Sequence, residues 1–250
     1  MQSNIKIGTA GWTIPKLCAE AFSAAGSHLE RYATRFNAAE INSSFYRPHK
    51  PITYARWASS VPPGFRFAVK VPREITHIRK LAAITELLER FLSEVTALGD
   101  ALGPLLVQLP PSLRYEAASA EPFFDAIRAR FPGDVVCEPR HLSWFTDTVD
   151  SVLSKFQIAR VAADPPVAPI AAVPGGWPGI VYRRLHGSPK MYYSAYSESD
   201  LKLTAETMLE TIEHTRESWC IFDNTALGAA CKDALDLSRH LCSASPFGAP

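Results

Sequence analysis

Residues 138–144 (EPRHLSW) place an acid, a permanent cation, an imidazole and an indole directly after the apolar run 135–137. A carboxylate and an imidazole can exchange protons with a substrate, and an arginine can hold an anion through paired, charge-assisted hydrogen bonds. Polar groups at the end of an apolar strand are typical of the working rim of a parallel α/β protein. The segment therefore offers Glu138, Arg140 and His141 as the first candidates for a functional site.

Seven other apolar runs can be interpreted as strands, and most of them also end in a polar residue. The eight runs cover residues 5–12, 38–46, 65–72, 104–110, 134–138, 158–164, 180–187 and 219–224. Helices are expected between most of them, at residues 27–36, from Pro51, at 86–98, 119–131, 147–156, 197–216 and up to 242. Ser27 with Glu30 forms a capping box, and Ser119 and Ser197 are further expected caps. The pattern predicts an α/β fold, a single (β/α)8 TIM barrel with eight parallel strands.

The chain length of 250 residues suits one such domain, and no internal repeat suggests a second. Residues 165–179 hold too many prolines and glycines for a helix. They predict an irregular crossover between the sixth and seventh strands, either a lid over the rim or a surface linker. Residues 243–250 are expected to form a flexible tail.

Alternation along the strands indicates which polar side chains share the inner face. Tyr182, Arg184 and His186 fall on one face of the seventh strand, and adding the polar ends of the other strands gives a ring. The ring comprises Glu40, Asn42, Lys70, Gln108, Glu138, Asp164, Arg184, His186 and Asn224, with Trp12 beside it. Because buried charges are costly unless they are paired or used, this ring favours a site, and a network of mutually satisfied ion pairs is the alternative.

Lys70 has two interpretations within this ring. Nearby cations could depress its pKa and make it a Schiff-base or general-base lysine, or it could pair with Glu40 or Glu138. Trp12 and Trp144 could stack on a ligand ring, although core packing accounts equally well for an indole.

Composition limits the partners. The net charge of +1 supplies no general field for a polyanion, so nucleic acid is not favoured. If it did bind, the basic stretch 73–80 could contact phosphates. Five cysteines without a CxxC pair indicate reduced thiols in a cytoplasmic protein. Neither a signal peptide nor an apolar run of membrane-spanning length is found, so no membrane association is expected.

Several segments together resemble the DUF72 (YecE-like) family, over about residues 5–240. They are IGTAGW, RYATRFNAAEINSSFYR, VPPGFRFAVKVPREITH, LGPLLVQLPPS, EPRHLSWF, YRRLHG, YSAYSESDL and IFDNTALGAA. The resemblance implies a TIM-barrel fold but no activity, because none is established for the family. It implies characteristic positions at Trp12, Glu40, Asn42, Ser43, Tyr46, Lys70, Gln108, Glu138, Arg140, His141, Trp144, Asp164, Arg184, His186 and Asn224.

The chain departs from the family pattern at three positions. Pro139 and Leu142 stand where phenylalanine and proline are more usual, which alters the backbone that aims Arg140 and His141. Asp223 stands where an asparagine pair is common, and its alternation points away from Asn224.

Three functions are compatible with these residues. The preferred one is a cofactor-free enzyme acting on a small phosphorylated or carboxylate substrate. Lys70, Arg140 and Arg184 would bind the anion, Glu138 or Glu40 would be the base, and His186 or His141 the acid.

The second function is a Mg-, Mn- or Zn-dependent hydrolase or isomerase, possibly acting on nucleic acid and similar to the xylose isomerase and endonuclease IV barrels. Its ligands would be Glu138, Asp164 and His186. The third function is a non-catalytic ligand-binding barrel, and the oligomeric state is left open by the sequence.

Overall fold

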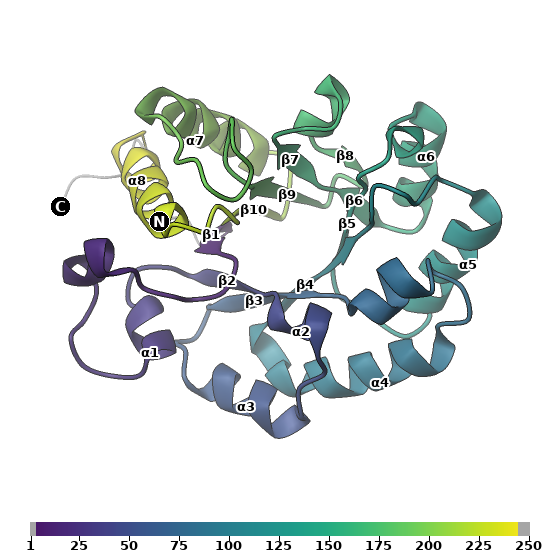
Figure 1. Ribbon diagram of the computed structural model, residues 1–250, viewed down its shortest axis with the longest axis horizontal. Helices are drawn as coiled ribbons and strands as arrows, with labels where there is room; N and C mark the ends of the chain where they lie inside the picture. Colours follow the sequence, from purple (N-terminus) through teal and green to yellow (C-terminus); the bar gives the residue numbers. More distant parts are fainter. Residues whose placement is uncertain (1–3, 245–250) are drawn as a thin grey trace.

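The computed structural model describes residues 4–244, and its strands lie inside a ring of helices (Figure 1). The strands are β1 (Ile5–Thr9), β2 (Ala38–Ile41), β3 (Arg66–Lys70), β4 (Leu102–Gln108), β5 (Val135–Glu138), β6 (Ile158–Arg160), β7 (Ala162–Asp164), β8 (Gly175–Gly176), β9 (Ile180–Leu185) and β10 (Glu217–Phe222). Every predicted strand segment overlaps at least one of them, and the predicted α/β class is confirmed.

The strands form two hydrogen-bonded sheets, in the orders β2-β3-β4-β5-β6-β8 and β1-β10-β9-β7. Neighbours are parallel except for the short β6–β8 pair. The chain passes from β6 into β7 through Val161, and an isolated parallel bridge joins Ala10 to Glu40. The expected closed sheet of eight strands is therefore not one continuous ladder within residues 4–244, because the sixth predicted strand is divided between the two sheets.

The helices follow the sequence pattern except for α2, which occupies the end of the segment 38–46 that was predicted as a strand. They are α1 (His28–Tyr32), α2 (Ser43–Tyr46), α3 (Pro51–Ser59), α4 (Thr85–Val95), α5 (Ala117–Arg128), α6 (Asp147–Lys155), α7 (Glu198–Ile212) and α8 (Ala229–Ala244). Capping boxes begin α1 at Ser27 and α7 at Ser197, as predicted. The expected cap at Ser119 is wrong, because Glu116 is the residue before α5 and Ser119 lies in the first turn.

Short helical turns complete the connections. They are the 3₁₀ turns Lys16–Ala21, Thr96–Ala101, Leu142–Trp144 and Pro169–Ala172, and the π-helix Glu74–Ile78. Residues 165–179 contain only such a turn and strand β8, so the irregular crossover is confirmed. Of the expected flexible tail, residues 243 and 244 end α8, and residues 245–250 lie outside the described part of the chain. No helix of residues 4–244 is both long and apolar enough to cross a membrane.

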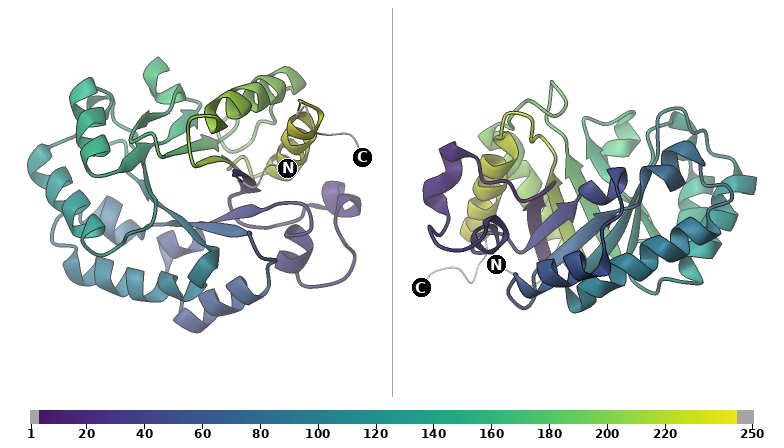
Figure 2. Two further views of the ribbon diagram at one scale, coloured as in Figure 1. Left: turned by 180° about the vertical axis from the view of Figure 1, so that it is seen from behind. Right: turned by 60° about the horizontal axis from the view of Figure 1, so that its bottom comes forward.

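Two separate apolar clusters show which way the strand residues point. A small cluster, which includes Ala68, Leu106, Val136, Ile180 and Ile221, lies on the inner side of the strands. The alternate residues join a larger cluster with the helices, which cover the outer side of the strands in both views of Figure 2. Because β5 and the second half of β10 are buried on both faces, they read as continuous apolar runs, whereas β9 is equally buried but carries Arg183 and Arg184.

Candidate active site

Arg184 lies at the centre of a buried group of charges at the carboxyl ends of the strands. Its Nη2 and Nε donate to the two carboxylate oxygens of Glu40, at 2.6 and 3.0 Å. Its Nη1 donates to Glu138 at 2.7 Å, and its Nη2 also reaches Asp223 at 3.0 Å. The rigid fork of guanidinium donors suits such multiple pairing. We refer to Glu40, Glu138, Arg184, His186 and Asp223 as the central cluster.

His186 bridges two carboxylates of the central cluster. Its Nε2 lies 2.8 Å from Glu138 Oε1, and its Nδ1 lies 3.0 Å from Asp223 Oδ2. Arg140 Nη2 lies 2.5 Å from both that Glu138 oxygen and His186 Nε2. A protonated ring can donate to both carboxylates, whereas a neutral ring with its proton on Nδ1 can accept from Arg140. The contacts of His186 therefore suit two protonation states.

The cations keep Glu138 and Asp223 ionised. Burial alone would raise the pKa of Glu138, but Arg184, Arg140 and His186 outweigh it and hold the pKa well below its usual range. Burial likewise opposes ionisation of Asp223, and Arg184 and His186 lower its pKa. A general base for neutral pH needs the opposite shift. Glu138 is therefore better suited to hold Arg140 and Arg184 than to act as the base expected from the sequence.

Tyr182 extends the cluster toward the inner core. Its hydroxyl donates to Glu40 Oε2 at 2.9 Å, and it stacks on Trp219 with ring centroids 5.7 Å apart. Burial and the neighbouring Glu40 raise the pKa of Tyr182 well above its usual value. The tyrosine is thus a fixed hydrogen-bond donor that orients Glu40.

Lys70, the last residue of β3, differs from the other charged groups. Its side chain is buried, and Nζ lies 4.3 Å from the centroid of the Phe45 ring. Within residues 4–244, Nζ forms neither a hydrogen bond nor an ion pair, so the expected pairing with Glu40 or Glu138 is not formed. Burial and the nearby Arg184 lower the pKa of Lys70, although Glu40, Glu138 and Asp223 act in the opposite direction. Ser44 fixes the backbone here by donating to the Lys70 carbonyl at 2.6 Å.

Two residues of the predicted ring, Asp164 and Asn224, point to the outer side of the strands. Asp164 pairs in register with Leu185, on the outer side of the strands, and accepts a hydrogen bond from Tyr196 at 2.7 Å. Asn224 also points outward, where it donates to Asp233 at 2.7 Å. Alternation brings the neighbouring Ala163 and Asp223 inward instead, so Asp164 and Asn224 were assigned to the wrong face. Asp223 and Asn224 do point to opposite sides, as expected.

The alternative metal ligands are consequently not brought together. Glu138 and His186 are in contact, but Asp164 lies on the opposite side of its strand, and Arg184 occupies the space between the carboxylates. Among the described residues, no group of three or more acidic, histidine or cysteine side chains has a geometry that could hold a metal ion.

The aromatic residues expected to bind ligand have packing roles or are exposed. Trp144 is buried and donates from Nε1 to the carbonyl of Leu113 at 2.9 Å. Trp12 packs edge-on against Trp57, with ring centroids 5.1 Å apart. Tyr46 is 79% exposed. The core interpretation is therefore confirmed for Trp144, and Trp12 has the same kind of environment.

The remaining predicted residues have differing positions. Gln108 lies opposite Glu138 in the β4–β5 register, and Asn42 has a buried side-chain oxygen without a hydrogen-bond partner. His141 accepts from the backbone of Ser143 at 3.1 Å, so it begins the turn Leu142–Trp144 rather than facing the central cluster. Arg140 does reach the cluster despite the neighbouring Pro139.

Sequence reasoning did not include two residues among the site residues. Asp223 belongs to the central cluster, and the alternation of Trp219 and Ile221, both inside, is the signal that could have found it. Tyr192, from the loop after β9, places its ring edge-on to His186 with centroids 5.7 Å apart. No strand or helix pattern marks Tyr192 in the sequence.

Fold and site together define a parallel α/β protein with a buried arginine–carboxylate–histidine cluster where its strands end. The chain belongs to the DUF72 family: the model described as "Protein of unknown function DUF72" matches residues 6–247. The family expected from the sequence is thereby confirmed.

Relatives and solved structures agree with this assignment. The chain is 31% identical over 166 residues to the UPF0759 protein YecE of Escherichia coli, a match that covers 64% of this chain and 59% of that protein. It is similar to the crystal structure of a DUF72 family protein from Enterococcus faecalis, with 21% identity, a TM-score of 0.81 and 98% of both chains covered. It is also similar to the crystal structure of a DUF72 family protein from Thermotoga maritima, with 23% identity, a TM-score of 0.78, and 95% of this chain and 98% of that chain covered. These structural likenesses show the fold.

Proposed function

We propose that this protein is an enzyme that acts on a small phosphorylated or carboxylate substrate by acid/base chemistry at the carboxyl ends of its strands. One observation carries the proposal. The carboxylates around Arg184 are locked in ion pairs, whereas the amine of Lys70 has no such partner among the described residues and its pKa is lowered. An amine that loses its proton more readily than a free lysine can serve as a base or a nucleophile.

Arg140 is the anion-binding residue in this proposal. Its side chain is nine-tenths buried, and its Nε is a buried donor that has no partner within residues 4–244. A substrate oxygen would satisfy that donor through a charge-assisted hydrogen bond. Arg184, by contrast, already binds three carboxylates, so it holds the side chains of the site in place and does not bind the substrate.

His186 supplies the second proton-transfer group. Because its Nε2 lies within 2.8 Å of both Glu138 and Arg140, losing a proton exchanges the hydrogen bond that Nε2 donates to Glu138 for one that it accepts from Arg140. His186 would donate a proton to one side of the substrate, while Lys70 would remove a proton from the other side of the substrate. Glu40 and Tyr182 keep Arg184 in place during both steps.

The proposal extends to the setting of the site. We propose that the two sheets together form a (β/α)8 barrel. The strands then follow one another from β2 to β6, through β7, β9, β10 and β1, and return to β2 at the Ala10–Glu40 bridge. The five cysteines are free thiols, which supports a reducing, cytoplasmic location. The net charge of +1 supports a small substrate over nucleic acid.

Anion binding is the first test. Thermal unfolding should be measured with phosphate, sulfate, pyruvate and glycerol 3-phosphate for the wild type, Arg140→Ala and the control Arg216→Ala. Arg216 is exposed and pairs with Asp134 near the opposite ends of the strands. An anion present at 100 times its dissociation constant stabilises the native state by about 2.7 kcal/mol. The proposal requires this stabilisation in the wild type and Arg216→Ala, and its loss in Arg140→Ala; stabilisation that survives in Arg140→Ala contradicts it.

Turnover distinguishes an enzyme from a non-catalytic binding barrel. Anions that stabilise the protein should be incubated with it in deuterated water and followed by NMR. Proton exchange or conversion that is present with the wild type and lost with Lys70→Met supports catalysis. Binding without exchange or conversion of any bound anion would favour the binding barrel.

A further inference from the structure

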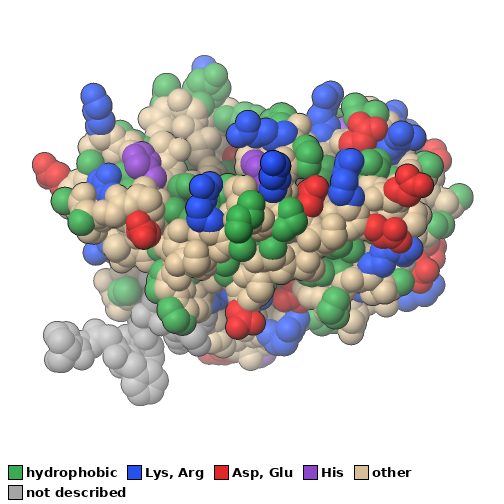
Figure 3. Space-filling model, turned by 90° about the horizontal axis from the view of Figure 1, so that it is seen from below, with side chains coloured by type: hydrophobic (Ala, Val, Ile, Leu, Met, Phe, Trp, Pro, Cys, Tyr) green, Lys and Arg blue, Asp and Glu red, His purple; other side chains and the backbone are tan. Residues whose placement is uncertain are grey.

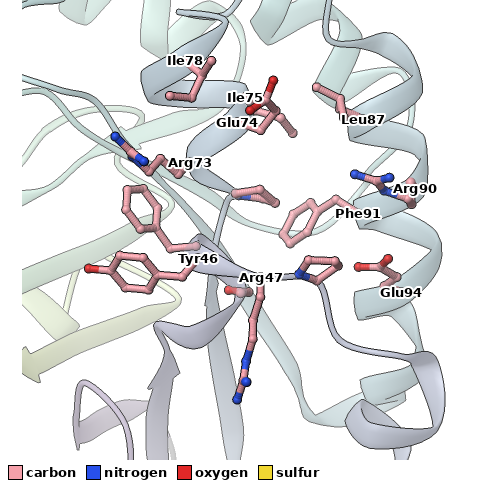
Figure 4. A pocket seen from close by; sticks show the side chains of 14 residues that line it. Tyr46, Arg47, Arg73, Glu74, Ile75, Ile78, Leu87, Arg90, Phe91 and Glu94 are labelled. Carbon is pink, nitrogen blue, oxygen red and sulfur yellow. The ribbon is translucent and has the colours of Figure 1, made fainter.

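A cavity lies at the rim of the fold, lined in part by Phe45, whose ring also meets the amine of Lys70. It has a volume of about 290 Å³ and is enclosed by α2 and the turn after it, the π-helix Glu74–Ile78, and α4. Figure 4 shows Tyr46 and Arg73 on one side of it, and Leu87, Arg90, Phe91 and Glu94 of α4 on the other. No residue of the central cluster lines it.

The inner surface of this rim cavity is apolar and largely aromatic. Phe45, Ile75 and Phe91 line it and are themselves buried, and Pro48 and Pro72 add flat apolar surface. The Phe45 ring is fixed from several directions, because it also meets Tyr46, His77 and the amine of Lys70. Such a surface favours a planar apolar group, and aromatic pairs contribute beyond the area that they bury.

The charged groups of the rim cavity leave one positive charge uncompensated. Arg73 and Arg90 form no hydrogen bond or ion pair through their guanidinium groups within residues 4–244, and Glu74 is already paired with Arg79 at 3.1 Å. Glu94 is the remaining acid, and burial raises its pKa although Arg90 opposes this. Arg47 also lines the cavity, but its side chain runs away from the centre in Figure 4.

The surface around the rim cavity is consistent with this balance of charges. The face seen in Figure 3, on the side where α3 and α4 lie, carries Lys and Arg side chains near its upper edge with hydrophobic side chains between them. Arg73 and Arg90 lie on opposite sides of the cavity in Figure 4, and with Glu94 as the one remaining acid their charges match a ligand with one negative charge. Arginine offers bidentate geometry to a carboxylate.

We propose that the rim cavity binds a small aromatic carboxylate, with its ring against Phe45 and Phe91 and its carboxylate held by Arg73 and Arg90. Because neither Lys70 nor a member of the central cluster is among the residues that line the cavity, this is a separate site, and it does not depend on the function proposed above. The volume of about 290 Å³ is at the small end of ligand sites and suits one ring with a short acidic chain.

Titration calorimetry with 3-phenylpropionate tests the proposal, with 3-phenylpropanol and acetate as probes that lack the charge or the ring. The variants are Arg73→Ala and Arg90→Ala, which change exposed side chains and should fold. Arg79→Ala is the matched control, because Arg79 lies on the same rim but does not line the cavity. Arg140→Ala separates the rim cavity from the central cluster.

We expect 3-phenylpropionate to bind the wild type more tightly than either control probe. Each of Arg73→Ala and Arg90→Ala should weaken binding about tenfold, corresponding to about 1.4 kcal/mol. Arg79→Ala and Arg140→Ala should leave it unchanged. The proposal is wrong if the wild type does not bind 3-phenylpropionate, if 3-phenylpropanol binds equally well, or if Arg140→Ala and not the rim variants abolishes binding.

Discussion

Replacing Glu40 with glutamine removes the carboxylate that holds Arg184 at two points, at 2.6 and 3.0 Å. Both side chains are fully buried. Breaking one partner of a buried ion pair costs about 3–5 kcal/mol, because the other charge stays buried without compensation. Glutamine keeps one oxygen that can accept from Arg184, and Glu138 and Asp223 remain in place. We therefore expect the lower end, about 3 kcal/mol.

A matched control is available at Asp164, the acid that lies on the outer side of its strand. It is only half-buried and accepts one hydrogen bond, from Tyr196 at 2.7 Å. Asparagine can accept the same bond, so Asp164→Asn should cost about 1 kcal/mol. The comparison separates the effect of the central cluster from that of removing any acid near the rim.

Urea unfolding at neutral pH, followed by circular dichroism, measures both free energies of unfolding. In thermal unfolding, Glu40→Gln should lower Tm by about 6–12 °C, since about 1 kcal/mol corresponds to 2–4 °C in a chain of this size. Equal losses in the two variants, or a loss below about 1 kcal/mol in Glu40→Gln, would refute the structural role given to the Glu40–Arg184 pair.

Three further outcomes follow from the same contacts. Because the pKa of Glu138 is lowered in the folded state, its contribution is present above the unfolded value of about 4.3 and is lost as the pH falls. The free energy of unfolding of Glu138→Gln, measured with urea, should therefore fall less steeply with decreasing pH than that of the wild type. An unchanged slope of this free energy against pH would contradict the prediction. Because the pKa of Lys70 is lowered, stability should rise with pH between its folded value and about 10.4, and Lys70→Met should lack this rise. Asn224→Ala should cost about 2 kcal/mol by removing a donor from buried Asp233, yet leave phosphate stabilisation intact; loss of that stabilisation would place Asn224 in the site.

Much of the central cluster was predictable from the sequence. Strand alternation placed Glu40, Arg184 and His186 on one inner face, with Lys70 beside them, and Glu138 was added from the end of its strand. The structure brings these strand ends together. A charge in a strand that is otherwise apolar is costly unless several charges share the same region. That constraint makes such residues informative even without a structure.

The wrong assignments of Asp164 and Asn224 have a physical cause in the strands that these residues end. Asp164 and Asn224 end strands that are apolar on both faces, so polarity does not indicate which face is inside. The end of a strand can then be assigned to either side, and a shift of one residue reverses the outcome. In both cases the neighbouring position, Ala163 or Asp223, is the inward one.

Other features depend on contacts between distant segments. Trp144 ends the segment 138–144, but its indole turns back to the Leu113 carbonyl and packs against Tyr115 and Phe124. The division of the sixth predicted strand into β6 and β7 likewise depends on which neighbours each half pairs with. Neither feature has a local signal in the sequence.

The most direct test of the account is the pKa of Lys70 itself, because the proposed chemistry depends on that amine losing its proton readily. The pKa can be measured from the pH dependence of Lys70 acylation by a small reagent, with peptide mass spectrometry to identify the residue and an exposed lysine, Lys202, as internal reference. The account predicts that Lys70 titrates below the reference value of about 10.4 and below Lys202. A pKa for Lys70 at or above that of Lys202 would contradict the proposed role of Lys70 as base or nucleophile.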